Sequence, residues 1–366
     1  MPERWSPIDR FTPKERELPE ELYDVMSRLN KTAMTEVPEL SIADFNMPDI
    51  IREKDAEYVR KLMERRREFT LEKSEYAAFL ETVLPETQAA DWFGDEVHIN
   101  RYRGEIDVYN DQRGADYILE LESSDPKRIP VLRVDVTKTN SREQIFDEKI
   151  GAVERSMERG HFADVYFASQ AHEEVMQKVH HAPGIVWHLN PDQIIDLGKS
   201  VGTVLKREKG SNQALAEHPL QLLLIDQAKS QLENQALYII GLLFQEIDRQ
   251  NVATRLPAER RLKLVALYDR AVKAVHDGAQ DVLTILKDTL TEDLRSLPRA
   301  SETVELLSDI EPWLSHFKNL QQKKMSSLSE NIQKRAHEQS GLNPIHEELV
   351  ARSPHLDQIF PGRLAA

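Results

Sequence analysis

The chain has 366 residues, of which 40% are hydrophobic and 30% are charged, and its formal net charge at pH 7 is −15. Because this length exceeds the size at which one hydrophobic core usually keeps growing, we expect two domains. The absence of cysteine excludes disulfides, thiolate metal sites and cysteine nucleophiles, and the negative charge argues against broad electrostatic capture of nucleic acid.

The sequence also predicts where the protein resides. No basic segment followed by an apolar one begins the chain, so no secretory signal is expected. The most apolar run, Ala236 to Phe244, has nine residues, about half of what a membrane span needs. Since a cysteine-free chain also fits a reducing compartment, we expect a cytoplasmic protein with no membrane partner.

The first part of the chain predicts an arm and two helices. Residues 1–47 are rich in proline and charge, with one short helix expected near Glu20 to Leu29, so they indicate an extended N-terminal arm. A long helix is expected from Pro48 to about Phe69. Ser74 then has the chemistry of an N-cap for a second helix, which Pro85 ends.

From Glu96 the hydrophobic period changes from that of a helix to that of a strand. The alternating segments are 97–108, 117–122 and 131–138. Breaker-rich turns separate them, so an antiparallel meander is predicted.

The following segments alternate between helix and strand. A capping box at Ser141 and Gln144 begins a helix that Gly160 ends. An apolar strand at 163–168, a helix at 172–179, a strand at 185–189 and a helix capped by Asn190-Pro191 are expected next. This order predicts a mixed sheet with a parallel portion, covered by helices on both faces. We therefore expect residues 48–206 to form an α/β sandwich domain.

The last part of the chain predicts helices alone. Residues 207–213 are polar, contain glycine and are the expected linker. Helices follow at 219–250, 257–288, 301–338 and 344–351, with Gly278 as a candidate break in the second. We therefore expect an all-α bundle domain over 214–352, with the helix at 219–250 at its buried centre, and a C-terminal tail over 353–366.

Carboxylates on the expected strands are the strongest chemical signal. Opposite the apolar residues of the meander lie Glu105, Asp107, Glu120, Glu122 and Asp135. Adjacent like charges on a sheet need water, arginine or a divalent cation between them. Since Mg²⁺ and Mn²⁺ prefer carboxylate oxygens, Asp107, Asp135, Glu120 and Glu122 are candidate metal ligands.

The sequence Gly104-Glu105-Ile106-Asp107, and Asp135-Val136-Thr137-Lys138 before the next helix, are two acidic motifs in the expected strands. With Glu81 on the helix before them, residues 74–190 resemble the PD-(D/E)XK nuclease superfamily, which has the restriction-endonuclease-like fold. The resemblance implies that Asp107 and Asp135 bind Mg²⁺ or Mn²⁺ and that Glu81 is the helix acid. It also implies that Lys138 orients the attacking water or stabilises the charge that develops on the phosphate.

The second motif departs from the family pattern. The family places its acid and its lysine two residues apart, whereas Asp135 and Lys138 are three apart. A β-bulge would restore the geometry, a lysine from elsewhere in the chain would replace Lys138, or the fold persists without activity. The alternative acidic pair, Glu120-Leu121-Glu122, has a glutamate where the lysine belongs.

Two hypotheses of function follow. In the first, the chain is a metal-dependent nuclease that hydrolyses DNA phosphodiester bonds within a DNA-processing or defence system. Because this chain has no strong basic patch, the other subunits of that system would supply the affinity for DNA. In the second, it is a non-catalytic assembly protein with a nuclease-like fold, and Arg133 merely pairs with Glu120 or Glu122 on a solvated sheet face. In both, the helical domain binds a protein partner or a second copy of the chain.

Overall fold

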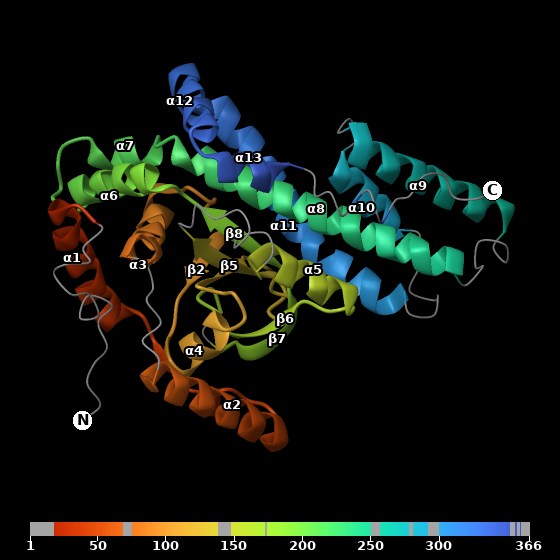
Figure 1. The fold of residues 1–366 in the computed structure, drawn as a ribbon, viewed down its shortest axis with the longest axis horizontal. Coiled ribbons are helices and arrows are strands. Elements are labelled where there is room, and N and C mark those ends of the chain that lie inside the picture. The colour runs from red at the N-terminus through yellow and green to blue at the C-terminus, as the bar shows by residue number, and fades with distance from the viewer. Residues whose placement is uncertain are drawn as a thin grey trace.

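A mixed sheet lies in the middle of the molecule, with the long helix α8 (Leu220–Arg249) along one side and helix α2 (Asp49–Glu68) on the opposite side (Figure 1). The computed structural model describes residues 18–68, 75–137, 148–172, 174–249, 257–277, 281–291, 300–351, 356 and 359. Within these ranges, no helix has both the length and the apolarity needed to cross a membrane. The predicted order of a mixed α/β region followed by helices is confirmed.

The central sheet has four strands in the described part of the chain, in the spatial order β2, β4, β5, β8. Their bounds are β2 Val97–Asn100, β4 Tyr117–Leu121, β5 Val131–Thr137 and β8 Gly184–His188. The first three form the predicted antiparallel meander, and β8 runs parallel to β5, as predicted. Three apolar residues of β5 enter the largest hydrophobic core, Leu132, Val134 and Val136. The polar residues that alternate with them therefore face the other side of the sheet.

A segment predicted to continue the first strand is a helix instead. After the two-residue strand β3 (Arg103–Gly104), helix α4 (Glu105–Asp111) begins. Gly104 ends the extended run with a φ of 83°, and a Cβ there would lie 2.9 Å from the Leu40 carbonyl oxygen. Acidic residues in the first turn of α4 stabilise the positive end of the helix. The predicted position of Asp107 on a strand was therefore wrong.

Strand β6 (Ala163–Ala168) is present where it was predicted but lies outside the central sheet. It pairs antiparallel with β7 (Met176–Ala182), so the helix predicted over 172–179 was wrong. This hairpin lies between α5 (Gly151–Glu158) and β8 along the chain. Its apolar residues pack with those of α2 and α4 in a second hydrophobic cluster, and this tertiary pairing overrides the local helical pattern.

The N-terminal helices belong to the body of the molecule. Helix α1 (Glu20–Glu36) is longer than predicted and packs against α3 (Glu75–Val83) and α6 (Pro191–Leu205). It contributes Leu22, Val25, Met26 and Leu29 to the largest core, so this part of the expected arm is not peripheral. Residues 1–17 of that arm lie outside the described residues. Short elements complete this region: β1 Glu39–Leu40 and the 3₁₀ helices η2 Ile42–Asp44 and η3 Leu84–Ala90.

After β8, the described residues contain helices and no strand, as predicted. Besides α6 and α8 these are α7 Ser211–Ala216, α9 Ala258–Asp277, α10 Val282–Thr291, α11 Ala300–Ser327, α12 Glu330–Gly341 and α13 Pro344–Val350. The expected N-cap of α6 is present as a capping box between Asn190 and Gln193. The two long helices predicted over 257–288 and 301–338 are each two helices.

Glutamines of α8 satisfy the free edge of strand β8. The Gln227 amide accepts from the His188 N–H at 2.9 Å and donates to the His188 carbonyl at 2.9 Å. Gln231 bonds both backbone groups of Val186 at 2.8 Å, and Gln235 donates to the Gly184 carbonyl at 2.7 Å. Since residues four apart lie on one face of a helix, this row replaces the neighbouring strand that β8 lacks.

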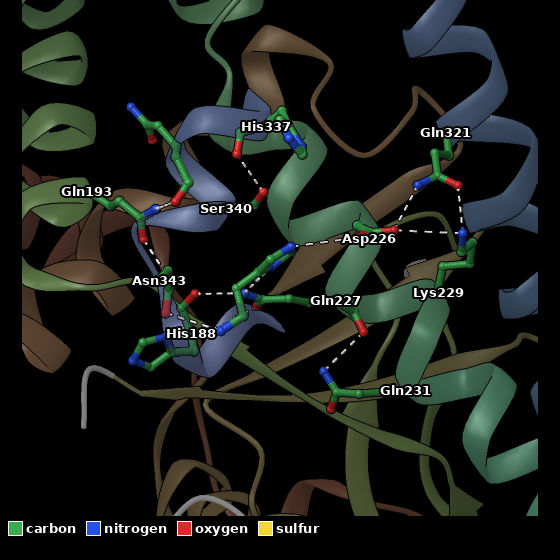
Figure 2. A network of polar contacts seen from close by, with 12 residues as sticks. His188, Gln193, Asp226, Gln227, Lys229, Gln231, Gln321, His337, Ser340 and Asn343 are labelled. Carbon is green, nitrogen blue, oxygen red and sulfur yellow. Dashed lines mark hydrogen bonds and ion pairs between the residues drawn. The ribbon is translucent and has the colours of Figure 1, made fainter. Parts of the chain in front are cut away.

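Further polar contacts attach the C-terminal helices to α8 (Figure 2). Gln321 of α11 donates to Asp226 at 3.0 Å and accepts from Lys229 at 2.9 Å, and Gln227 contacts His346 of α13 at 3.2 Å. One hydrophobic cluster includes residues from both sides of the expected linker 207–213. The sheet and the helices therefore share a core, while the domain boundary itself stays a prediction.

The half-buried Asp309 of α11 makes stability depend on pH. Burial raises the pKa of Asp309 from 3.8 to about 7, and Glu305, one turn earlier, adds to the rise. Because the folded state then holds this proton more tightly than the unfolded state, the contribution to stability is lost as pH rises from about 4 to 7. We expect Asp309→Asn to raise the free energy of unfolding by about 1–2 kcal/mol at pH 8 and by much less at pH 5.

Urea unfolding of this variant at pH 5 and pH 8 checks the prediction. The exposed Glu302 at the start of the same helix provides a matched control, Glu302→Gln. A gain in stability that is equal at the two pH values would show that the Asp309 carboxyl is not the titrating group.

Candidate functional site

Two acidic residues, Asp116 and Asp135, lie at one end of the meander, where β4 begins and β5 ends. Asp116 directly precedes β4, and its backbone N–H donates to the Val134 carbonyl at 2.9 Å. Its carboxylate accepts from the Val136 N–H at 2.7 Å. Asp116 is therefore bonded to the backbone groups of Val134 and Val136, the two residues that flank Asp135 on β5.

A lysine from the next helical segment joins Asp135. The Lys149 ammonium donates to Asp135 Oδ1, and the side chains are 23% and 19% exposed. Lys149 lies in the helical turn that leads into α5. An ion pair at this depth is only partly screened by solvent, so it holds the Asp135 carboxylate and the lysine in place.

Arg133 fixes the backbone around the two acids. Its buried guanidinium donates to the Ala182 carbonyl at 2.9 Å and to the Arg113 carbonyl. Burial lowers the pKa of Arg133 to about 10, and Asp135 opposes this shift. A Cβ at Gly184 would lie 2.6 Å from the guanidinium, so the glycine gives Arg133 its space. The alternative in which Arg133 pairs with glutamates of the sheet was wrong.

The predicted helix acid lies at the same end of β4. The Tyr117 hydroxyl donates to the backbone carbonyl of Glu81 on α3. Burial raises the pKa of Tyr117 well above its usual value, Arg101 opposes the rise, and the Glu81 and Asp116 carboxylates add to it. Helix α3, which carries Glu81, shares its hydrophobic core with Tyr117 and the apolar residues of β5, so it packs on the face of the sheet opposite to that of Asp135.

The two glutamates predicted to bind metal lie apart from Asp116 and Asp135 in their contacts: Glu120 bonds a loop, and Glu122 is exposed. Glu120 is fully buried, and its carboxylate accepts from the Ser169 hydroxyl, from the Gln170 N–H at 2.8 Å and from Asn100 at 3.3 Å. It therefore anchors the loop after β6 to the sheet. Glu122 is exposed and lies 3.4 Å from the His98 ring.

The predicted four-carboxylate metal site does not form. Asp107 is exposed on α4, a helix that packs against α2, β3 and β6. Across the described ranges, no three His, Asp or Glu side chains are placed to hold one metal ion. Lys138 lies outside the described residues. What the structure does bring together is Asp135 and Lys149, joined by an ion pair, with Asp116 bonded to the backbone that flanks Asp135.

Sequence reasoning missed Asp116 and Lys149. No role was predicted for Asp116, although it directly precedes the apolar strand that begins at Tyr117. Lys149 is 14 residues after Asp135, so no local spacing links them.

Comparisons with known proteins identified no similar protein. Neither a scan against protein-family models nor searches of curated proteins and of solved structures found a match to this chain.

Proposed function

We propose that the chain is a metal-dependent nuclease that hydrolyses DNA phosphodiester bonds, with Asp116, Asp135 and Lys149 in its active site. The observation that carries the proposal is the ion pair of Lys149 with Asp135 near the end of β5, beside Asp116, whose carboxylate bonds the next backbone N–H of the same strand. The order of the surrounding elements supports it, because helix α3, strands β2, β4 and β5, helix α5 and strand β8 resemble the core of the PD-(D/E)XK superfamily.

In this proposal two residues replace those expected from the sequence. Asp116 takes the role expected of Asp107, and Lys149 takes the role expected of Lys138. A lysine from the following helical turn meets the requirement of the second motif without a β-bulge, because it reaches the Asp135 carboxylate directly. The departure in spacing after Asp135 is then no obstacle to catalysis.

The donor set fits Mg²⁺ or Mn²⁺. Mg²⁺ is usually held by one or two carboxylates, with water and substrate phosphate oxygens completing its shell, so two acids suffice. The Val136 N–H orients the Asp116 carboxylate, and Lys149 orients that of Asp135. When bound, such an ion polarises the phosphate and lowers the pKa of a coordinated water. Lys149 is placed to stabilise the negative charge that develops on the phosphate.

The test compares wild type with Asp135→Asn. We expect the variant to cleave plasmid DNA at least about 10²-fold more slowly in Mg²⁺, because a preorganised charged group at the reacting centre has an effect of this size. Calorimetry should show Mn²⁺ binding that is saturable in wild type and weakened in the variant. The melting temperature should fall, because Asp135→Asn leaves the mostly buried Lys149 without its carboxylate, so circular dichroism at the assay temperature checks that the variant is folded.

The control is Asp107→Asn, which changes the exposed acid on α4. Cleavage by this variant should equal that of wild type. If wild type neither binds millimolar Mn²⁺ nor cleaves DNA, the nuclease proposal fails. The alternative, an assembly protein with a nuclease-like fold, would then be the working hypothesis.

A further inference from the structure

Arg113 lies beside the proposed active site and is held by two aromatic rings. Its guanidinium carbon is 5.5 Å from the centre of the Tyr58 ring and 5.2 Å from that of Tyr109. The two rings are nearly perpendicular, with their centres 6.1 Å apart. Cation–π contacts of this kind fix an arginine side chain without using its N–H donors.

The backbone places this arginine at the edge of the Asp116–Asp135 pair. The Arg113 carbonyl accepts from the Arg133 guanidinium, two residues before Asp135. At the next position, Gly114, a Cβ would lie 3.6 Å from the Asp135 carboxylate. Arg113 is therefore anchored through its main chain to the strand that carries Asp135.

The charge of Arg113 is not balanced by a carboxylate among the described residues. The side chain is exposed, and in the part of the chain that the structure describes no carboxylate lies within ion-pair distance of it. A chain with a net charge of −15 offers many acids for pairing, so an arginine that contacts two rings rather than an acid needs another explanation. Its five donors match the oxygens of a phosphate group.

We propose that Arg113 binds a phosphate of the DNA backbone next to the bond that is cleaved. This inference rests on the proposed function, because it takes the Asp116–Asp135 pair as the reacting centre. Tyr58 and Tyr109 position the guanidinium before DNA arrives, so less side-chain freedom is lost on binding. Arg113 gives the acidic protein a local contact for a substrate that its net charge would repel.

The experiment measures DNA binding separately from cleavage. A fluorescein-labelled duplex of about 20 base pairs is titrated with protein in EDTA, where metal-dependent cleavage is absent, and its anisotropy gives the Kd. We expect Arg113→Gln to raise the Kd about 5- to 20-fold, because one charge-assisted contact is lost, and Arg113→Lys to raise it less. The slope of log Kd against log salt should fall by about 1 in Arg113→Gln.

Arg128→Gln is the matched control. Arg128 is an exposed arginine in the turn at the opposite end of the same two strands, so it carries equal charge but lies away from the site. Its substitution should leave the Kd within about twofold of wild type, because surface charge acts weakly over that distance at physiological salt. Circular dichroism of each variant checks that the fold is kept.

The outcomes separate this inference from the nuclease proposal. A wild type that cleaves DNA, with an unchanged Kd in Arg113→Gln, would overturn the role of Arg113 and leave the nuclease in place. Weaker binding in Arg113→Gln, with no cleavage by any variant, would support the phosphate contact and contradict the nuclease. Equal losses in Arg113→Gln and Arg128→Gln, or no DNA binding by wild type, would overturn the inference.

Discussion

In the proposed nuclease, the Lys149→Met variant is expected to cleave DNA about 10²- to 10³-fold more slowly than wild type, because it removes the cation that pairs with Asp135. The loss should appear mainly in kcat, since the charge that Lys149 is proposed to stabilise develops on the phosphate only as the bond breaks. Mn²⁺ affinity should be kept or increased, because the Asp135 carboxylate, the proposed metal ligand, no longer has a cation beside it.

Two further variants sharpen this prediction. Lys149→Arg keeps the positive charge and should recover part of the activity, although a planar guanidinium does not take the position of an ammonium. Lys127→Met removes an exposed lysine from the turn at the other end of β4 and β5 and should have no effect. Cleavage by Lys149→Met within threefold of wild type would remove this lysine from the active site.

The largest expected effect on stability comes from the glutamines that face β8. In a Gln227→Leu, Gln231→Leu double variant, the N–H and C=O groups of Val186 and His188 lose their partners while they stay buried. Each unsatisfied group costs about 1–3 kcal/mol, so we expect the free energy of unfolding to fall by roughly 4–6 kcal/mol after leucine burial offsets part of the loss. Such a loss is a large part of the stability of an ordinary domain.

Urea unfolding followed by circular dichroism measures this effect. Gln213→Leu is the control, because that glutamine is exposed on α7 and bonds only to Glu217 one turn later. If the double variant does not fold, the single Gln235→Leu, which removes one bond to Gly184, should still show a loss of about 1–2 kcal/mol. A change below about 0.5 kcal/mol in that single variant would contradict the role of the row, because surface substitutions have effects of this size.

Local chemistry predicted much of the fold. The breaker-rich turns around β4 and β5 marked the meander, and the capping box at Asn190 marked the start of α6. Helix α4 was missed because Glu105 to Tyr109 alternate as in a strand, although the buried Ile106 and Tyr109 are also three apart, as on one face of a helix. The positive φ of Gly104 ends the extended chain directly before this segment.

Other parts of the molecule depend on contacts between distant residues. Strand β7 exists because it pairs with β6, and no property of residues 172–179 alone records that pairing. Of the proposed active site, Asp135 was predicted. Asp116 and Lys149 were not, because their proximity to Asp135 follows from the register of β4 on β5 and from the path into α5. The cation–π contacts of Arg113 join residues of α2 and α4 to the turn before β4, and no pattern in the sequence indicates such contacts between separate segments.

The row of glutamines on α8, Gln227, Gln231 and Gln235, also affects how the protein unfolds. A helix that completes the hydrogen bonding of a sheet cannot leave without exposing an unpaired strand edge, which is a template for association with other chains. The helices and the sheet should therefore unfold in a single cooperative transition. It follows that the Asp116–Asp135 pair keeps its geometry only while α8 stays docked, although none of the three glutamines contacts either acid through a hydrogen bond described above.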